Sequence, residues 1–226
     1  MFLGMVGLGA AGIVGGASVQ SALGKFLRPV TNTAGGLSSL IPGSDTFRIY
    51  TVTDGFPEVT PAQYRLKVGG LVASPFTLSL ADLQGLPRTT LVRDFQCVTG
   101  WRVPSVRWDG VLLSDLLDRA GVAPSARAVS FDSFDGAYTE SLTLDQARRN
   151  DVIVAYGFDN GPVSTEHGGP VRLYVAPMYG YKSCKWLGGI RVVDRVEPGY
   201  WEQEGYDVDA WIGASNGRHD APVDGR

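Results

Sequence analysis

The arrangement of short strand-like segments most restricts what this chain can fold into. After about residue 41, runs of β-favouring residues alternate with short amphipathic stretches, separated by Gly, Pro, Asn and Asp. Residues 64–72 and 76–80 alternate with a period of two, which predicts a hairpin around a turn at Gly69 and Gly70. Over that same part of the chain, the sequence contains no internal repeat and no Gly-x-Gly-x-x-Gly motif. An α+β fold with mixed sheets is therefore predicted, rather than a doubly wound nucleotide-binding fold.

Local capping signals predict where the short helices begin and end. Ser79 is placed to cap a helix over residues 80–86. Thr143 and Gln146 form a capping box ahead of a helix over residues 144–150. An amphipathic helix within residues 112–121 has Ser114 as its candidate N-cap and Gly121 just past its end. The other strands are expected at residues 126–134 and 138–144, joined at Asp135-Gly136, and at residues 151–158, 171–176 and 190–196.

The composition predicts one catalytic-sized domain and excludes one class of partner. A chain of 226 residues that is 44% hydrophobic and 19% charged can bury one sizeable core. The formal net charge is −3, whereas binding along a phosphate backbone needs a surplus of Lys and Arg on one face. We therefore expect no nucleic-acid partner, and we expect any basic cluster to bind a small anion.

The first 40 residues have the composition of a targeting segment. No charge occurs before Lys25, and Gly and Ala are abundant, as in the weakly apolar core of a twin-arginine (Tat) export signal. Two interpretations stay open: a Tat signal whose Arg-Arg pair lies in frame upstream of Met1, or a Gly-rich membrane anchor. Residues 1–40 are assigned to this segment and a Gly/Ser linker, and residues 41–226 to the folded domain. The expected location is the cell envelope or periplasm.

The two cysteines, Cys97 and Cys184, lie far apart in the sequence. They form no Cys-x-x-Cys pair and no zinc-like or haem-attachment spacing. Cys97 can be a small buried apolar residue, half of a disulfide with Cys184, or the thiolate ligand of a metal. The residues alone leave these three roles open.

Basic residues and glycines cluster between Glu166 and Ile190. His167 and Arg172 flank a Gly-Gly-Pro turn, and Lys182 and Lys185 follow close to Gly180. Glycine allows the main chain to approach a ligand closely, and Arg and Lys supply donors in a geometry that binds phosphate. The segment therefore predicts an anion cradle, and an ordinary hairpin with solvated cations is the alternative.

Several separated motifs, taken together, resemble a known family. Residues 95–121, 137–147, 155–163 and 167–187 resemble, in that order, the molybdopterin domain of the sulfite oxidase superfamily. The likeness is greatest to its short bacterial branch, which includes the periplasmic methionine-sulfoxide reductase catalytic subunit, and it runs from about Phe47 to Val193. The resemblance implies a mixed-sheet, sulfite-oxidase-like α+β fold. It also implies a Mo-molybdopterin cofactor with one molybdenum and one pyranopterin.

The resemblance also implies roles for individual residues. Cys97 takes the position of the cysteine that ligates molybdenum, and a soft thiolate suits a metal that cycles between two oxidation states. His167 and Arg172 take the positions that hold the pterin and its phosphate. Ser183, Cys184 and Lys185 take the positions of a second cofactor-binding turn, to which Cys184 contributes mainly its backbone. Further cofactor-binding candidates are Arg48, Tyr50, Thr51, Val52 and Ser133.

The sequence departs from the family in ways that affect the expected substrate and partners. Val-Thr-Gly-Trp-Arg follows Cys97 where sulfite oxidases have a Gly-Asn-Arg-Arg run, so Arg102 is the one arginine left there. Arg102 and Tyr138 are the predicted catalytic side chains beside Cys97, and Trp101 supplies an apolar wall that suits a neutral sulfoxide better than a doubly charged oxyanion. No immunoglobulin-like dimerisation domain, haem domain or flavin domain is recognised. A monomer with a separate electron-transfer partner, such as a membrane cytochrome, is therefore expected.

The predicted function is a molybdopterin-dependent, two-electron oxygen-atom transfer on a small sulfur compound, by sulfoxide reduction or sulfite oxidation. A binding protein that kept the fold without the cofactor is one alternative. A disulfide-stapled structural domain of the envelope is another.

Overall fold

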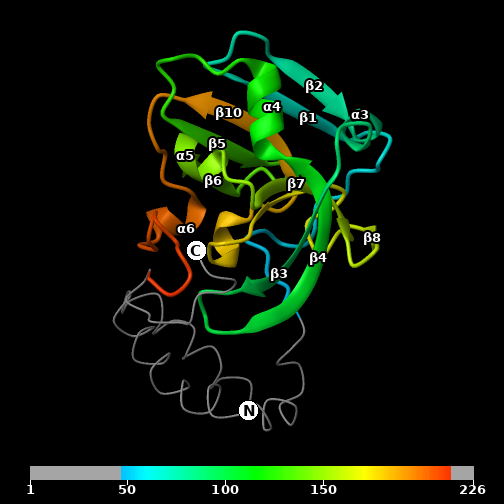
Figure 1. Cartoon of the computed structure of the whole chain (residues 1–226). Coiled ribbons are helices and arrows are strands. Elements are labelled where there is room, and N and C mark those ends of the chain that lie inside the picture. Colours follow the sequence, from blue (N-terminus) through cyan, green and yellow to red (C-terminus); the bar gives the residue numbers. More distant parts are fainter. Residues whose placement is uncertain (1–46, 215–226) are drawn as a thin grey trace, which may run out of the picture.

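The computed structural model describes residues 47–214 of the chain. One of its two sheets is a five-stranded mixed sheet (Figure 1). Its strand order is β2 (Phe76–Ser79), β1 (Arg65–Gly70), β10 (Leu187–Val193), β5 (Ala128–Ser133) and β6 (Thr139–Thr143). β1 runs parallel to β10, and the other neighbouring pairs are antiparallel. Helix α4 (Leu113–Ala120) lies across this sheet in Figure 1 and buries four of its side chains: Leu113, Leu116, Leu117 and Ala120.

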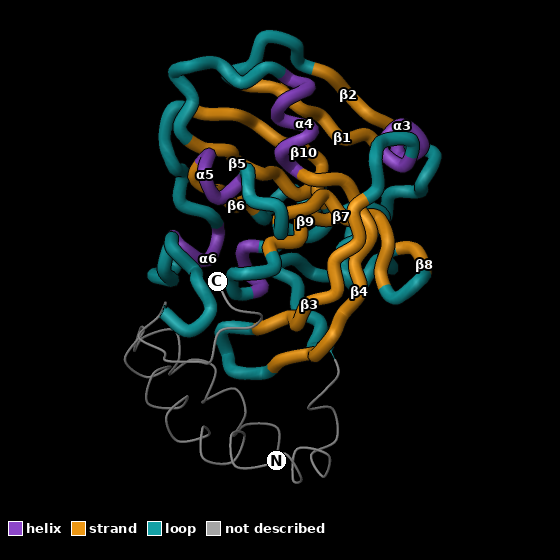
Figure 2. Tube along the Cα trace, viewed as in Figure 1, coloured by secondary structure: helices purple, strands orange, loops and turns teal. Residues whose placement is uncertain are grey.

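A second sheet carries most of the aromatic core. It consists of β3 (Thr89–Gln96), β4 (Arg102–Leu112), β7 (Val152–Phe158) and β8 (Gly161–Pro162), and β9 (Arg172–Val175) also pairs with β7. Figure 2 shows β4 as a long curved strand that runs from the turn after β3 to the start of α4. Trp108 of β4 is fully buried and stacks on Tyr174 of β9, with ring centroids 4.9 Å apart. This contact fixes β4 against β9 across the intervening strand β7.

The predicted starts of two helices and the predicted end of a third are confirmed. Ser79 caps α3 (Leu80–Gln84), and its hydroxyl accepts a hydrogen bond from the Asp82 backbone N–H at 3.1 Å. Thr143 and Gln146 form the predicted capping box, although α5 (Leu144–Ala147) is shorter than expected. Gly121 ends α4 with a φ of 69°, in the left-handed region that favours glycine.

The predicted cap at Ser114 is wrong. Helix α4 begins at Leu113 and has Leu112 at its N-cap position, with no side-chain cap hydrogen bond. β4 continues directly into the helix, and the buried leucines on one face of α4 decide where it starts.

Two strand predictions also need correction. Gly69 and Gly70 do not form the hairpin turn but end β1, where they pair with Arg191 and Val192 of β10. The turn follows them instead, and the Ala73 N–H donates to the carbonyl of Gly121 at 2.8 Å. The strand predicted at residues 190–196 begins earlier, as β10, and strands β3 and β4 were not predicted at all. The sequence of β4 contains Pro104 and several charged residues, so its strand structure depends on pairing with β3 and β7.

The targeting segment and linker predicted for residues 1–40 lie outside the described residues. Within residues 47–214, no helix is both long enough and apolar enough to cross a membrane.

Candidate active site

A cavity of about 350 Å³ gathers side chains from segments that are far apart in the sequence. Its lining includes residues 47–52, the turn after β3, the β5–β6 turn, the loop before β9, the 3-10 helix η2 (Gly180–Lys182) and helix α6 (Tyr200–Gln203) with the turn that follows it. Ten of the thirteen predicted site residues line this pocket: Arg48, Tyr50, Thr51, Val52, Cys97, Tyr138, His167, Arg172, Ser183 and Lys185.

A tight turn after β3 presents Cys97 to the pocket. The Cys97 N–H donates to the carbonyl of Trp101 at 2.9 Å, and the Gly100 N–H donates to the carbonyl of Cys97 at 3.0 Å. The Cys97 side chain is half-buried, and its Sγ lies 3.2 Å from the Thr99 hydroxyl oxygen. Neither Cys97 nor Cys184 forms a disulfide, so the disulfide interpretation is not supported. A partly accessible thiol on a short turn has the accessibility that a metal ligand needs.

Gly180 allows η2 to pack closely against the turn that carries Cys97. A Cβ atom at Gly180 would lie 2.3 Å from Cζ of Phe95, so the ring of Phe95 occupies the space that a side chain would take. The Phe95 ring also stacks on Trp101, with centroids 5.7 Å apart and an interplanar angle of 25°. The missing side chain at Gly180 therefore brings the predicted anion cradle and the thiol turn together.

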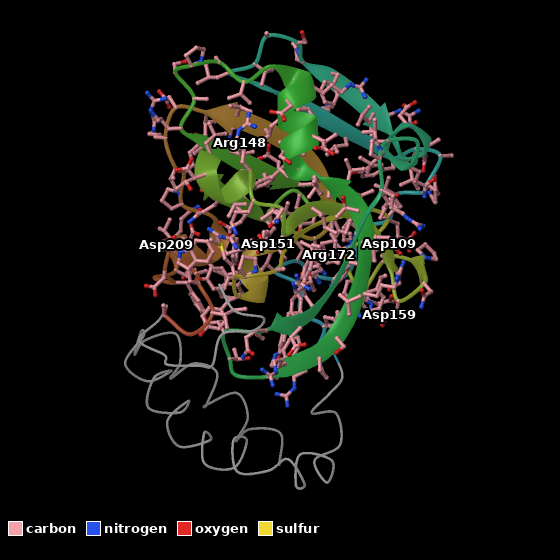
Figure 3. All side chains as sticks on the ribbon, in the orientation of Figure 1. Asp109, Arg148, Asp151, Asp159, Arg172 and Asp209 are labelled. Carbon is pink, nitrogen blue, oxygen red and sulfur yellow. The ribbon has the colours of Figure 1, made fainter. Side chains whose placement is uncertain are left out.

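Arg172 is a buried cation whose hydrogen-bond partners in the protein are all neutral. Its guanidinium donates to the carbonyls of Leu173 at 3.2 Å, His167 at 2.6 Å and Ser183 at 2.9 Å. Burial lowers the pKa of Arg172 to about 10, and none of the ion pairs within residues 47–214 includes it. Figure 3 labels Arg172 near the middle of the described part of the chain. A guanidinium has five N–H groups, and these bonds use three of them, so two remain for a ligand.

Lys185 and His167 lie on the same side of the pocket as Arg172. The Lys185 ammonium donates to the carbonyl of Tyr50 at 2.5 Å and lies 4.2 Å from the ring centroid of Trp186. Burial, together with the charge of Arg172, lowers the pKa of Lys185 to about 7. Burial and Arg172 also lower the pKa of His167, so at neutral pH its imidazole is a neutral hydrogen-bonding group. Two cations that repel each other in a half-buried pocket favour a bound anion.

Two buried polar atoms of the pocket wall have no hydrogen-bond partner within residues 47–214. They are Nε1 of Trp101 and Oδ2 of Asp135, and both residues line the cavity. Asp135 uses its other oxygen to accept from the N–H groups of Ala137 and Tyr138, both at 2.9 Å. A buried donor or acceptor without a partner costs about 1–3 kcal/mol, so these atoms indicate a polar ligand. Together with the accessible thiol and the two cations, they fit a phosphorylated, nitrogen-rich cofactor such as molybdopterin.

Three predicted site residues lie outside the pocket. Arg102 is directed toward solvent, where its Nε lies 3.4 Å from Asp94 Oδ2. Trp101 ends the turn after β3 and lines the pocket, whereas Arg102 begins β4 and is exposed. Ser133 is buried and accepts from the N–H of Asp135 at 3.1 Å, so it shapes the turn behind the pocket wall. Cys184 is fully buried, and its carbonyl accepts from the Leu173 N–H at 2.8 Å.

Lys182 does not belong to the predicted cradle. Its side chain is fully buried, and its Nζ contacts the carboxylates of Glu140 and Glu202 on the far side of η2. Tyr138 lines the pocket as predicted, but its hydroxyl donates to the carbonyl of Tyr181 at 2.5 Å, so it presents mainly its ring.

Sequence reasoning missed the walls supplied by the C-terminal part of the domain. Trp201 and Tyr206 line the pocket, and their ring centroids are 5.3 Å apart. The sequence pattern predicts only a turn at Asp135, although this residue also lines the pocket. The aromatic residues clustered after the last predicted strand were the signal that could have identified the missing wall. Other pocket-lining residues not predicted are Phe47, Ile49, Phe95, Val98, Thr99, Glu166, Gly180, Tyr181 and Trp186.

The mixed-sheet fold, and a pocket that joins a thiol to buried cations, define a molybdopterin-binding oxidoreductase domain. The model of the oxidoreductase molybdopterin-binding domain family matches residues 53–201, and the chain belongs to this family. The chain is 36% identical to the uncharacterized oxidoreductase YuiH of Bacillus subtilis, over 66% of this chain and 76% of that protein. It is 31% identical to the protein-methionine-sulfoxide reductase catalytic subunit MsrP of Ralstonia nicotianae, over 62% of this chain and 47% of that protein.

A solved structure supports the same fold. The sulfane dehydrogenase SoxCD of Paracoccus pantotrophus superposes with a TM-score of 0.57 at 26% identity, covering 63% of this chain and 41% of that one. The chain thus spans only about half the length of the methionine-sulfoxide reductase and less of the sulfane dehydrogenase. The predicted sulfite-oxidase-like α+β fold is confirmed, and the protein is an oxidoreductase that depends on a Mo-molybdopterin cofactor.

Anion binding to cofactor-free protein is expected to depend on the protonation of Lys185. Its ammonium is charged below its pKa of about 7 and neutral above it. Sulfate, whose charge stays constant, is therefore expected to raise the thermal midpoint more at about pH 6 than at about pH 8.5. Without an anion, Lys185 binds its proton more tightly in the unfolded state than in the folded state from about pH 7 to about pH 10. Lys185 therefore makes the free energy of unfolding rise with pH in that range.

The matched control for this titration is Lys185→Met, which is expected to remove the pH dependence of the sulfate effect. An equal effect of sulfate at both pH values in the wild type would contradict the role of Lys185 in anion binding.

Proposed function

We propose that this protein reduces sulfoxides to sulfides, consuming two electrons and two protons and releasing water for each sulfoxide. When bound, the molybdenum cofactor supplies the two-electron oxygen-atom transfer chemistry. The observation that carries the proposal is that the pocket lining beside Cys97 is aromatic, whereas Arg102 and Arg107 are engaged by Asp94 and Asp109 outside it. A doubly charged oxyanion needs more compensating charge on desolvation than this wall provides.

The proposed roles divide the pocket into two ends. Cys97 is the proposed metal ligand, and the pocket-lining cations Arg48, Arg172 and Lys185 are proposed to bind the pterin and its phosphate. Their cationic charge would then be matched by the cofactor, which leaves little of it for the substrate. His167 and Asp135 are placed to hydrogen-bond the pterin, one as a neutral imidazole and the other through its partnerless Oδ2.

Trp101 is the proposed substrate-binding residue. Its ring, 8% exposed, supplies an apolar surface for the alkyl groups of a sulfoxide. Its Nε1–H, which has no partner among the described residues, supplies a donor for the sulfoxide oxygen. A neutral sulfoxide needs both of these features.

Purified, molybdenum-loaded enzyme is expected to reduce sulfoxides with an artificial reductant at a higher kcat/KM than it shows for sulfite oxidation with an artificial acceptor. Trp101→Ala is expected to lower kcat/KM for sulfoxides about tenfold or more, and to affect sulfite less. Trp101→Phe keeps the apolar wall and removes only the donor, so it separates the two roles. Efficient sulfite oxidation with little sulfoxide reduction would overturn the substrate assignment and leave the cofactor assignment intact.

The electron partner and location are part of the same proposal. Residues 41–226 are proposed as one oxidoreductase domain that works as a monomer and receives electrons from a separate partner, such as a membrane cytochrome. The charge-free, Gly- and Ala-rich sequence before Lys25 supports a location in the cell envelope. Cell fractionation and the codons in frame before Met1 test the location and the twin-arginine route.

A further inference from the structure

Lys182 occupies a fully buried ionic cluster next to the pocket. Its Nζ lies 2.5 Å from Glu140 Oε1, at the start of β6, and also contacts Oε1 of Glu202 in α6. All three side chains have no exposed surface in these ion pairs. Burying three ionisable groups is costly, and apolar residues of similar volume are often at least as stable, so the cluster needs an explanation other than stability.

The cluster fastens α6 to the body of the domain. Glu202 also accepts from the Gly199 N–H through Oε2 at 2.8 Å, so one carboxylate binds both Lys182 and the start of its own helix. Gly199 packs directly on β6, where an added Cβ would lie 2.8 Å from the carbonyl oxygen of Thr139 and 2.9 Å from Glu140 Oε1. Lys182 and its two carboxylates therefore join α6 to β6, beside the stacking of Tyr200 on Tyr138, with ring centroids 5.8 Å apart.

The fastened segment forms a wall of the pocket. Trp201 belongs to α6, and the Tyr206 N–H donates to the carbonyl of Trp201 at 3.1 Å. The Tyr206 ring also meets Tyr181, with centroids 5.5 Å apart, and the Tyr181 hydroxyl donates to the carbonyl of Asp207 at 2.6 Å. Two neighbouring residues of η2 thus have different contacts. Tyr181 lines the pocket, whereas Lys182 is buried outside it and contacts Glu202 of α6.

We propose that Lys182 is a positioning residue that, through Glu202, holds Trp201 and Tyr206 in the pocket wall and so sets which sulfoxides fit. This inference rests on the proposed function. Because Ser183, next in the chain, binds Arg172, the same turn links the cofactor end of the pocket to its substrate wall. A loosened α6 would enlarge the substrate end and leave the cofactor end in place.

The charge of the cluster makes this positioning dependent on pH. Two carboxylates and one ammonium leave one excess negative charge, and burial raises the pKa of Glu140 to about 8. The other titratable groups near Glu140 are Tyr138 and Cys184, and burial raises both of their pKa values, so they are neutral here. Below about pH 8, Glu140 holds a proton and does not compete as an anion for the Lys182 ammonium. Above that pH, Glu140 becomes charged and competes with Glu202 for the ammonium.

The test combines Glu202→Gln, Lys182→Met and Glu140→Gln in holoenzyme with two measurements. The first is hydrogen exchange of the amides of residues 199–207, with molybdenum content measured on the same samples. Glu202→Gln and Lys182→Met are expected to speed this exchange about tenfold or more, while molybdenum content stays at the wild-type level. Lys67→Met, at an exposed position on β1, is the matched control and should leave both unchanged.

The second measurement is the ratio of kcat/KM for methionine sulfoxide to that for dimethyl sulfoxide. The two loosening variants are expected to change this ratio about tenfold through KM, with kcat for dimethyl sulfoxide within about threefold of the wild type. Glu140→Gln should match the wild type below about pH 8 and keep the exchange protection that the wild type loses above it. Since Glu202→Gln preserves side-chain volume, it keeps the test valid if Lys182→Met does not fold.

Unchanged exchange in residues 199–207 of Glu202→Gln would overturn the positioning role. Faster exchange with an unchanged ratio would overturn its link to selectivity. Enzyme that oxidises sulfite but reduces neither sulfoxide would instead refute the proposed function, and the exchange result would still decide whether Lys182 holds α6.

Discussion

Cys97→Ser is expected to abolish sulfoxide turnover and leave the fold intact. A serine hydroxyl is a harder and less acidic ligand than a thiol. If Cys97 ligates molybdenum, its replacement should slow turnover by more than about a hundredfold. That loss exceeds the one expected from mutating a residue that only contacts a metal ligand. The side chains are similar in size and the site is half-buried, so the free energy of unfolding should change by less than about 1 kcal/mol. Activity, thermal midpoint and molybdenum content of the purified variant check this expectation.

Cys184→Ser is the matched control for this experiment. Cys184 is fully buried, and its thiol donates to the carbonyl of Lys185 at 3.4 Å. A serine there is expected to cost about 1–3 kcal/mol of stability while activity persists. Equal losses of about 2–5 kcal/mol in both variants, with activity retained in Cys97→Ser, would instead favour a Cys97–Cys184 disulfide.

Arg172→Met is expected to yield protein that retains less than about a tenth of the molybdenum of the wild type. Arg172 is a buried cation of the pocket wall, with only 3% of the residue exposed. Its guanidinium also donates hydrogen bonds to the carbonyls of His167 and Ser183. Its removal takes away the charge that a phosphate needs and leaves three carbonyls without this donor. Metal and pterin content measure the first effect, and the thermal midpoint of cofactor-free protein measures the second.

Two variants separate charge from structure at Arg172. Arg172→Lys keeps a cation but cannot bind three carbonyls in the planar geometry of a guanidinium, so we expect cofactor content between those of the wild type and Arg172→Met. Arg148→Met removes a surface arginine that pairs with Asp118 at 2.6 Å and should change neither content nor stability by a measurable amount. Full cofactor content in Arg172→Met would show that the phosphate is held elsewhere.

The elements that sequence reasoning predicted correctly are those held by short-range interactions. The caps at Ser79 and Thr143 and the helix end at Gly121 depend on residues within three or four positions of each other. The hairpin between β5 and β6 likewise follows from the turn at Asp135 and Gly136. Ser114 shows the limit of this reasoning, because a capping residue has no effect when a strand leads directly into the helix.

The site could be predicted in part for the same reason. The order of motifs was enough to identify the molybdopterin family, and ten predicted residues meet in one pocket. The direction of individual cations was beyond the reach of sequence. Arg102 follows Trp101 directly, but Trp101 lines the pocket from the end of a turn, whereas Arg102 begins β4 and pairs with Asp94 outside the pocket.

By itself, the sequence determined the family, the positions of the local caps and turns, and which segments carry the thiol and the cations. Only the tertiary structure decided which of those cations face the pocket and which are neutralised elsewhere. Lys182 and Lys185 look equivalent in sequence, yet one is buried between Glu140 and Glu202 while the other faces the cavity. The physical reason is that a buried ammonium needs a nearby carboxylate, and the carboxylates that meet Lys182 come from β6 and α6, which are brought together only when the chain is folded.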